Sequence, residues 1–265
     1  MSVPTIVRDG SRSGADTIAD MRFDYSVVCD VGRVRETNED AALALPGVYL
    51  LADGMGGHDC GELASEAALT TLAAVSSGDD QDTTRSALDG LLLDAQQAIG
   101  AIDGDSGRRA GTTTTGVVVV TQGDQLYWLI VNIGDSRTYL YRGAELDQLT
   151  TDHSQVQEFV DAGFLTPEQA RVDPRRNVIT RALGAGMVEP AADYFSAPVL
   201  PGDTILVCSD GLTGELPDSE IADILAEATS PQAATEALVE AALALGAHDN
   251  VTVIVVTANA SEANG

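Results

Sequence analysis

The sequence predicts an α+β fold in which antiparallel β-sheets are covered by helices on their outer faces. Short apolar runs rich in Val, Ile and Leu, such as VYLLA at 48–52, have the length of strands rather than helices. Three β-rich runs within residues 115–141 are separated only by glycine-containing turns, which is typical of hairpins. Strands and helices do not alternate strictly, and this argues against a doubly wound parallel sheet.

The elements follow one another without an obvious linker. Residues 1–20 are polar, Gly- and Ser-rich and aperiodic, and are predicted to form a disordered tail ahead of one domain at 21–260. Strands are expected at 23–30, 48–53, 115–121, 125–132, 137–141, 203–209 and 251–257. Helices are expected at 62–75, 85–102, 218–226 and 231–245. Residues 150–190 contain short polar helical pieces and four arginines, and are interpreted as a flap inserted over one edge of the fold.

The composition excludes several classes of function. The 265 residues include 41 acidic and 14 basic ones, which gives a net charge of −27. Such a surface repels phosphate backbones and anionic lipids, so neither nucleic acid nor a membrane is an expected partner. Every basic residue is arginine, so GTTTTG at 111–116 lacks the lysine of a phosphate-binding P-loop and no Schiff base can form.

The sequence shows no sign of a membrane span, a signal peptide or a disulfide framework. No apolar run approaches the roughly 18 residues of a membrane span, and the N-terminus lacks the apolar region of a signal peptide. The three scattered cysteines do not suggest a disulfide framework. We therefore expect a cytoplasmic protein, and we take it to be a monomer.

Aspartates follow or precede strands at four similar corners. Asp53, Asp135 and Asp210 come at or shortly after the end of an apolar run, and Asp249 directly precedes one. Neighbouring strands of an antiparallel sheet end and begin at the same edge, so the four carboxylates can meet there. Each could be an ordinary turn residue. Together they could instead bind Mg²⁺ or Mn²⁺, which prefer oxygen ligands and would offset the repulsion between like charges. Gly54 would then expose its own carbonyl as a further ligand.

Five motifs together resemble the metal-dependent protein phosphatase family, the PP2C-like Ser/Thr phosphatases, and most closely its compact bacterial members. They occur in order between residues 22 and 258: DVGRVRETNED (30–40), LLADGMGGH (50–58), NIGDSR (132–137), CSDGL (208–212) and HDNVTVIVV (248–256). The resemblance implies a four-layer sandwich of two central antiparallel sheets flanked by helices on both outer faces. It also implies direct attack on the phosphate by a hydroxide that bridges two metal ions, either Mn²⁺ or Mg²⁺.

The resemblance assigns metal ligands residue by residue. By this match Asp53 bridges the two ions and the Gly54 carbonyl binds one of them. Asp210 and Asp249 would hold the other ion. Asp135 matches the ligand of a third, weaker ion.

The same match assigns the residues around the metals. Arg35 matches the arginine that binds the substrate phosphate, although beside Arg33 it could also be an ordinary surface residue. Glu39 and Asp40 match an acidic pair that orders metal-bound water. Asn250 would support Asp249 from behind or cap the turn.

Two positions depart from the family pattern. Met55 stands where eukaryotic members have a histidine proposed to protonate the leaving group, so His58 is the candidate acid, with a metal-bound water as the alternative. Gly214 stands where many members have an aspartate for the third metal. The third site is therefore expected to be weak, shifted to Glu215 or absent.

The predicted function is dephosphorylation of phosphoserine and phosphothreonine on proteins, opposing bacterial Ser/Thr kinases. Three alternatives remain open: a catalytically weak phosphoprotein-binding module, a dedicated phosphatase of one regulator such as an anti-sigma-factor antagonist, and a phosphatase of small metabolites. The arginines of residues 150–190 could form local salt bridges or a docking face for phosphorylated loops: Arg171, Arg175, Arg176 and Arg181.

Overall fold

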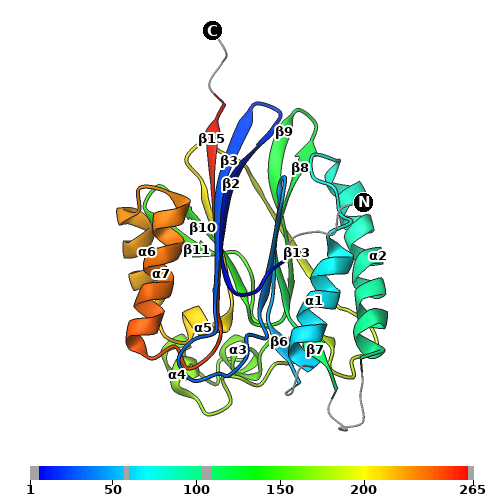
Figure 1. Cartoon of the computed structure of the whole chain (residues 1–265), viewed down its shortest axis with the longest axis vertical. Coiled ribbons are helices and arrows are strands. Elements are labelled where there is room, and N and C mark those ends of the chain that lie inside the picture. Colours follow the sequence, from blue (N-terminus) through cyan, green and yellow to red (C-terminus); the bar gives the residue numbers. More distant parts are fainter. Residues whose placement is uncertain (1–5, 57–59, 103–108, 262–265) are drawn as a thin grey trace.

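Two six-stranded antiparallel sheets lie face to face in the centre of the molecule (Figure 1). The computed structural model describes residues 6–56, 60–102 and 109–261. The first sheet has the order β1 (Ile6–Val7), β4 (Ala41–Leu45), β5 (Val48–Ala52), β8 (Thr114–Gln122), β9 (Gln125–Ile133) and β13 (Asp193–Pro198). The second has the order β11 (Glu145–Gln148), β10 (Arg137–Arg142), β14 (Thr204–Cys208), β15 (Val251–Ala260), β3 (Met21–Asp30) and β2 (Gly10–Ile18).

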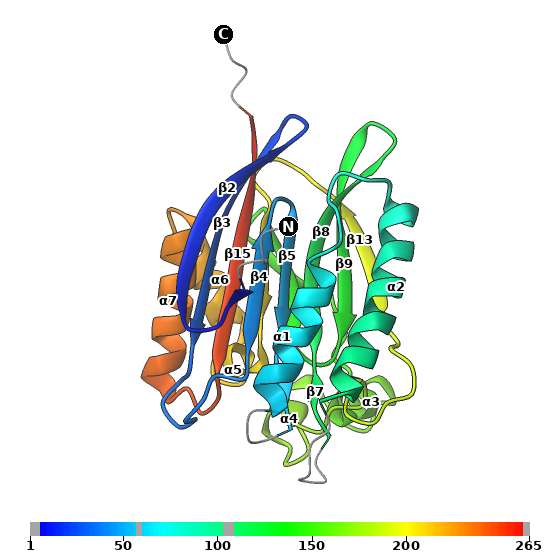
Figure 2. The ribbon, with the colours of Figure 1, turned by 45° about the vertical axis from the view of Figure 1, so that its right-hand side comes forward.

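Helices cover both outer faces of this pair of sheets, as Figures 1 and 2 show from two directions. The first sheet carries α1 (Cys60–Leu72) and α2 (Gln81–Gly100). The second carries α6 (Asp218–Glu227) and α7 (Pro231–Leu245), with the short α5 (Asp210–Thr213) at their lower end. The arrangement confirms the predicted four-layer α+β sandwich.

Three apolar clusters hold the layers together. The cluster between the sheets includes Trp128, Phe23 and Tyr49, all fully buried. A second cluster packs α1 and α2 on the first sheet, and a third packs α6 and α7 on the second. Because the central strands of both sheets are covered on both faces, their sequences are nearly continuous apolar runs rather than alternating ones.

The prediction of a disordered tail at residues 1–20 is wrong for most of that segment. β1 pairs with β4, and β2 pairs with β3 along its whole length. β2 lies at the edge of its sheet and is largely exposed, so main-chain hydrogen bonds to β3 hold it rather than apolar side chains. A polar sequence can therefore form this strand, and for that reason composition alone missed it.

The segment at residues 150–190 contains two short helices and one short strand. α3 (Gln155–Asp161) and α4 (Pro167–Val172) lie at the lower end of the molecule in Figure 1. β12 (Leu183–Gly184) joins a small sheet with β7 (Gly111–Thr112) and β6 (Gly54–Met55). We call residues 150–190 the flap.

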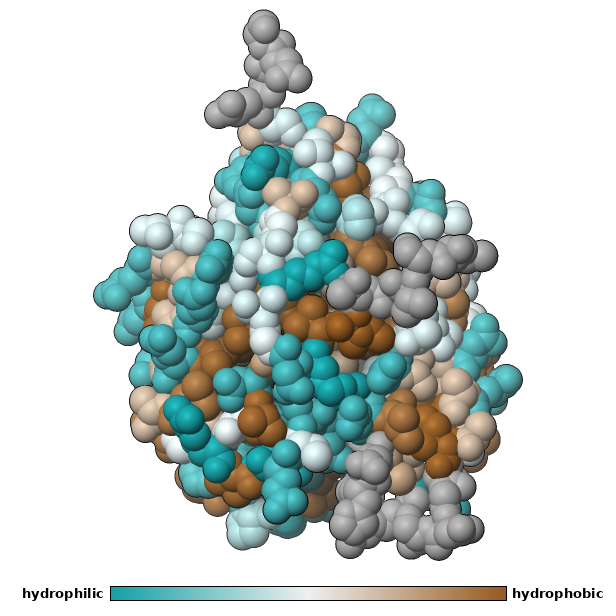
Figure 3. All heavy atoms as spheres, viewed as in Figure 1, coloured by the Kyte–Doolittle hydropathy of each residue, from teal (hydrophilic) through white to brown (hydrophobic). Residues whose placement is uncertain are grey.

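The surface is mixed in character. Hydrophilic and hydrophobic side chains lie side by side on the face shown in Figure 3, and hydrophilic ones dominate its lower centre. None of the helices in the described part of the chain is long and apolar enough to cross a bilayer.

Candidate active site

Acidic residues from both sheets gather at one end of the sandwich. Asp53 and Asp135 follow β5 and β9 of the first sheet, whereas Asp210 follows β14 and Asp249 precedes β15 in the second. Burial raises the pKa of Asp53 well above its usual range. The pKa is raised further by the negative charges of four neighbouring aspartates, Asp40, Asp210, Asp135 and Asp249. The strand ends thus bring the four corner aspartates together, as the sequence predicts. We call these four residues and Asp40 the carboxylate cluster.

Main-chain contacts fix the corner that carries Asp53. The backbone N–H of Asp53 donates to Thr113 Oγ1 at 3.0 Å. Its carbonyl accepts from the backbone N–H of Thr113 and the hydroxyl of Thr112, both at 2.9 Å. These bonds fix the main chain at the strand end from which the Asp53 side chain extends.

Gly54 sits where two other segments approach its backbone. A β-carbon at this position would collide with the carbonyl oxygens of Glu39 and Gly61. A glycine is therefore required so that the Asp53 corner can pack against both the Glu39 segment and the start of α1. The role of its carbonyl as a metal ligand stays a prediction.

Glu39 and Asp40 lie directly before β4 at the same end. Asp40 is 1% exposed, and its Oδ2 has no hydrogen-bond partner. Burial raises the pKa of Asp40 to about 7, the charges of Asp210 and Asp249 add to this, and the hydroxyls of Ser209 and Thr252 oppose it.

Glu39 contacts the first turn of α1. Its carboxylate accepts a hydrogen bond from the backbone N–H of Gly61, which favours the charged form, but burial raises its pKa overall. The position is typical of an anion at a helix N-terminus. Glu39 therefore links the cluster to the helix that covers the first sheet.

Asp210 and Asp135 share this environment. Burial and the charge of Asp249 raise the pKa of Asp210 to about 6. Burial, followed by the charges of Asp210 and Asp152, raises the pKa of Asp135 well above its usual range. Oδ1 of Asp135 is buried without a hydrogen-bond partner. Ionising all of these groups at once requires positive charge nearby.

Arg35 supplies one such charge. Its Nη2 lies 2.7 Å from Asp249 Oδ2, and its Nη1 lies 3.7 Å from Glu39 Oε2. The side chain remains 45% exposed, so a ligand can approach it from solvent. The structure therefore brings Arg35 to the cluster, as the sequence predicts.

Asn250 holds the segment that carries Arg35 and Glu39. Its Nδ2 donates to the carbonyls of Val31 and Thr37 at 3.0 Å, and its Oδ1 accepts from the backbone N–H of Glu39 at 2.9 Å. Its own N–H donates to Asp249 Oδ1 at 2.8 Å. Asn250 thus connects Asp249 to residues 31–39. The sequence predicts only that Asn250 supports Asp249 or caps the turn.

The structure describes Gly214 and Glu215, which belong to the positions that depart from the family pattern. Glu215 Oε1 lies 2.7 Å from His248 Nδ1 and accepts from the backbone N–H of His248, the residue that precedes Asp249. A shift of the third site to Glu215 stays a prediction. The backbone N–H of Gly214 bonds to the Asp210 carbonyl at the end of α5. His58 lies outside the described residues.

An open cavity of about 320 Å³ separates the flap from the cluster. Asp135 and Asp210 line one side, and Arg171 and Arg176 of the flap line the other. The two remaining flap arginines form local ion pairs, Arg175 with Asp173 at 2.8 Å and Arg181 with Asp193 at 3.0 Å. The salt-bridge interpretation is thus confirmed for Arg175 and Arg181, while the docking face stays a prediction.

The donor set fits a hard divalent cation. Side-chain oxygens of carboxylates supply the donors, and two of them, on Asp40 and Asp135, are buried and unpartnered. In residues 6–56, 60–102 and 109–261, no three His, Cys, Asp or Glu side chains are arranged so that they could hold a metal ion as they stand. The candidate cation site therefore rests on the grouping of the carboxylates and on their unpartnered oxygens, not on a preformed set of ligands.

Several residues of this region were missed by sequence reasoning. Asp152 binds Arg137 through both carboxylate oxygens at 2.7 to 3.0 Å, and Arg8 and Ser65 contact the Glu39 segment. Asp152 belongs to the polar flap, where no periodic pattern singles it out. Arg8 lies in the segment predicted to be disordered, whose polar and aperiodic sequence gives no signal for a strand.

Comparison with known proteins gives a consistent match. A family model described as Protein phosphatase 2C matches residues 33–245. The Serine/threonine protein phosphatase PstP of Mycobacterium tuberculosis is 39% identical over 233 residues, which cover 87% of this chain and 44% of that relative. The chain thus spans less than half the length of PstP. Protein phosphatase PhpP of Streptococcus pneumoniae is 36% identical over 250 residues, which cover 91% of this chain and all of that relative.

Solved structures agree with the fold. The structure of the M. tuberculosis serine/threonine phosphatase PstP/Ppp superposes with a TM-score of 0.79 at 37% identity and covers 89% of this chain and 98% of its own. A structure of the PstP catalytic domain in complex with two manganese ions gives a TM-score of 0.78 at 36% identity, with 90% and 99% coverage.

Proposed function

The chain belongs to the protein phosphatase 2C family, and on that premise we propose that it hydrolyses phosphoserine and phosphothreonine on proteins with the help of divalent cations. The carboxylate cluster is the observation that supports this most strongly. Acids from both sheets meet at one end, their pKa values are raised by burial and mutual repulsion, and two of their oxygens lack partners. Such a cluster is costly unless cations occupy it.

The proposed ligands are Asp53, the Gly54 carbonyl, Asp210 and Asp249 for two Mn²⁺ or Mg²⁺ ions. The related PstP catalytic domain, which was solved with two manganese ions, supports that number. Asp135 would serve a weaker third ion. When bound, the ions would offset the charge of the carboxylates and supply the Lewis acidity that activates water for in-line attack on phosphorus.

Arg35 would hold the phosphate. A guanidinium presents two parallel N–H donors that match two phosphate oxygens, and it stabilises the charge that develops during transfer. Its exposed edge faces solvent while its Nη2 contacts Asp249, so phosphate bound by Arg35 lies beside the cluster. Glu39 and Asp40 would orient water at the same place. His58 stays the candidate proton donor.

A protein substrate is favoured over a small metabolite. The cavity between the flap and the cluster is open, and Arg171 and Arg176 offer positive charge on its flap side. An extended phosphopeptide can use these contacts in addition to Arg35, whereas a small phosphate ester cannot. Ser/Thr kinases as functional counterparts, a monomeric state and a cytoplasmic location stay predictions from the sequence.

Two alternatives have specific consequences. A catalytically weak phosphoprotein-binding module would be expected to have lost a ligand carboxylate, yet Asp53, Asp210 and Asp249 are all present. A dedicated phosphatase of one regulator uses the same site and differs only in the range of substrates. Activity on unrelated phosphopeptides separates the second alternative from the general phosphatase.

The test is hydrolysis of a phosphothreonine peptide and of a sugar phosphate with Mn²⁺, Mg²⁺ or excess chelator. We expect peptide turnover that requires the cation, a much slower reaction with the sugar phosphate, and loss of activity in Asp210→Asn. Asp94→Asn is the matched control, because Asp94 is exposed on α2 outside the cluster. Absence of turnover by folded wild-type protein with either cation would contradict the proposal and favour the binding module.

A further inference from the structure

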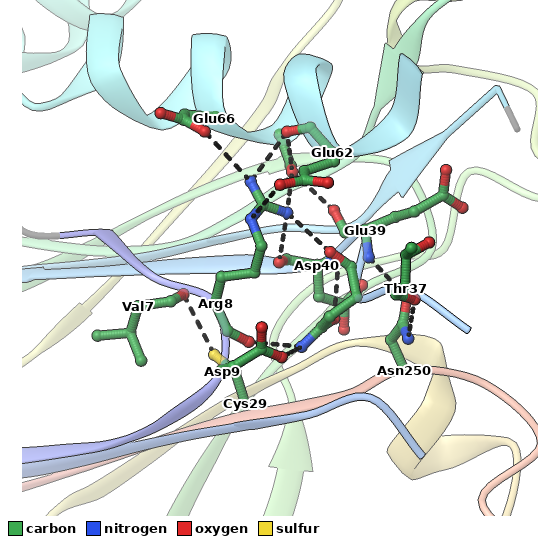
Figure 4. A network of polar contacts seen from close by, with 12 residues as sticks. Val7, Arg8, Asp9, Cys29, Thr37, Glu39, Asp40, Glu62, Glu66 and Asn250 are labelled. Carbon is green, nitrogen blue, oxygen red and sulfur yellow. Dashed lines mark hydrogen bonds and ion pairs between the residues drawn. The ribbon is translucent and has the colours of Figure 1, made fainter. Parts of the chain in front are cut away.

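Arg8 reaches the candidate active site from the segment that joins the two sheets. It follows β1, which pairs with β4 at the edge of the first sheet, and precedes β2, which pairs with β3 at the edge of the second. The thiol of Cys29 in β3 donates to the Val7 carbonyl and fastens this crossing. The Arg8 side chain is only 15% exposed. It points toward residues 38–40 and the first turn of α1 (Figure 4).

The guanidinium of Arg8 bonds to main-chain carbonyls on both sides. Nη1 donates to the carbonyls of Asn38 at 3.0 Å and Asp40 at 2.9 Å. Nη2 donates to the carbonyl of Glu62 at 2.9 Å in the first turn of α1. One planar group thus fixes the distance between the segment at 38–40 and the helix. A lysine cannot replace it, because an ammonium lacks this rigid fork.

Ser65 extends the same contact to Glu39. Its hydroxyl lies 3.2 Å from Arg8 Nη1 and donates to the Glu39 carbonyl at 2.6 Å. The carbonyls of three consecutive residues, Asn38, Glu39 and Asp40, are therefore held from one side by Arg8 and Ser65. On the other side, Asn250 accepts the Glu39 N–H. The segment at 38–40 is therefore hydrogen-bonded on both sides, to Arg8 and Ser65 on one and to Asn250 on the other.

Arg8 also holds Asn38 through its own backbone. The Asn38 side-chain amide donates to the carbonyl of Arg8 and, at 3.3 Å, to Asp9 Oδ1. The Asn38 Oδ1 in turn accepts from the backbone N–H of Asp40 at 3.2 Å. Displacing Arg8 would therefore release both the main chain and the side chain that orient Asp40.

We propose that Arg8 is a positioning residue that holds the segment at 38–40, and through it the Glu39 and Asp40 carboxylates, in place at the carboxylate cluster. Besides the main-chain carbonyls and Ser65, Arg8 pairs with the carboxylates of Glu62 and Glu66 on α1, at 3.7 and 3.8 Å. These contacts include none of the cluster carboxylates, and Arg8 does not line the cavity beside the cluster, so it acts through the main chain it binds. Arg8 lies outside residues 33–245, which match the family model. The contacts that hold the segment at 38–40 therefore come from the N-terminal strands, outside the matched region. The link to catalysis rests on the proposed function, whereas the positioning itself does not.

The first test measures the segment directly. Arg8→Gln removes the fork and the charge. Arg22→Ala is the matched control, because Arg22 pairs with Asp24 on the surface. Amide hydrogen exchange of peptides covering residues 36–41 should quicken by about tenfold or more in Arg8→Gln, with β14 unchanged. Unaltered exchange at 36–41 in a folded variant would overturn the proposal, whether or not the wild type is a phosphatase.

The second test measures the consequence for the site. We expect the Mn²⁺ concentration for half-maximal binding, followed by calorimetry, to rise about tenfold in Arg8→Gln and kcat on a phosphothreonine peptide to fall about fivefold. The KM for the peptide should stay within twofold, because Arg8 does not contact substrate. Mn²⁺ binding and kcat within twofold of wild type would show a role limited to packing and would overturn the link to the site.

A second variant covers the case in which Arg8→Gln does not fold. Ser65→Ala keeps Arg8 and removes only the hydroxyl that bridges to the Glu39 carbonyl. It should change hydrogen exchange at 36–41 and Mn²⁺ binding in the same direction by a smaller factor. No change in either quantity would contradict the proposal. A wild type that binds Mn²⁺ without turnover would count against the proposed function alone.

Discussion

The two ends of β14 carry buried acids with opposite surroundings. Asp203 precedes the strand and is 1% exposed. Asp40, in the carboxylate cluster beyond the other end of the strand, is also 1% exposed. Asp203 accepts hydrogen bonds from Arg142 Nε and Nη2 at 2.7 Å, from the Leu200 N–H at 2.8 Å and from Trp128 Nε1 at 3.2 Å. Beyond the other end of β14, Asp210 lies among further acids, and oxygens of Asp40 and Asp135 have no partner.

Burial alone therefore does not mark a functional carboxylate. A buried acid with a full set of donors stabilises the fold, since the donors replace the water it lost. Acids buried beside one another destabilise it when they ionise. Asp203 and its donors thus stabilise one end of the sandwich, whereas the acids around Asp210 at the other end lack enough donors and can bind cations. Substitutions at the two ends should therefore have opposite effects on activity and stability.

The largest expected effect is the loss of activity in Asp53→Asn. Removing this proposed metal ligand should lower kcat/KM for a phosphothreonine peptide by about 10³-fold, which corresponds to about 4 kcal/mol of transition-state stabilisation. The same variant should melt at a higher temperature than wild type in chelator, because one of several repelling charges is gone. Kinetics and thermal melting check the two parts. A variant that is both active and less stable would remove the contrast between the ends.

Asp203→Asn should show the reverse pattern. The amide keeps the size of the side chain but leaves the Arg142 guanidinium without its counter-charge, so we expect a loss of about 2 kcal/mol in the free energy of unfolding. Urea denaturation measures this loss. Activity per folded molecule should stay within twofold of wild type. An activity loss comparable to that of Asp53→Asn would mean that the two ends are not functionally distinct.

A smaller effect is expected from pH in the absence of cations. The pKa values of Asp40 and Asp210, about 7 and about 6, lie above their ordinary value of 3.8, so the folded protein binds more protons than the unfolded chain between these values. This contribution to stability is fully present below about pH 4 and is lost as pH rises through 6 to 7. The Tm in chelator should therefore fall by about 4 °C or more between pH 5 and pH 8.

Two variants sharpen this measurement. Asp40→Asn should flatten the fall in Tm, because it removes one of the titrating groups. Asp203→Asn should keep the fall while lowering Tm at every pH. A Tm in chelator that rises from pH 5 to pH 8 in the wild type would contradict the assignment of raised pKa values to the cluster.

Much of this fold is predictable because its strands are apolar runs and its helices are periodic. The corner aspartates could be recognised since each stands at a change from apolar to polar sequence, and their roles as metal ligands stay predictions from the five motifs. β4 (AALAL) was missed because alanine and leucine are strong helix formers and alanine is depleted in strands, so the local sequence does not favour a strand. β2 and Arg8 were missed because their stability comes from pairing with β3 and from carbonyls far along the chain. Such contacts have no local signature.

Direct cation binding tests whether two carboxylate oxygens beyond the end of β14, Asp40 Oδ2 and Asp135 Oδ1, lack partners because cations bind among these acids. Calorimetric titration of cation-free protein with Mn²⁺ should give about two ions per chain for wild type and for Asp203→Asn, as in the related PstP catalytic domain. Asp53→Asn and Asp210→Asn should bind fewer or far more weakly. Folded wild-type protein that binds no Mn²⁺, or Asp203→Asn behaving like Asp53→Asn, would contradict the account.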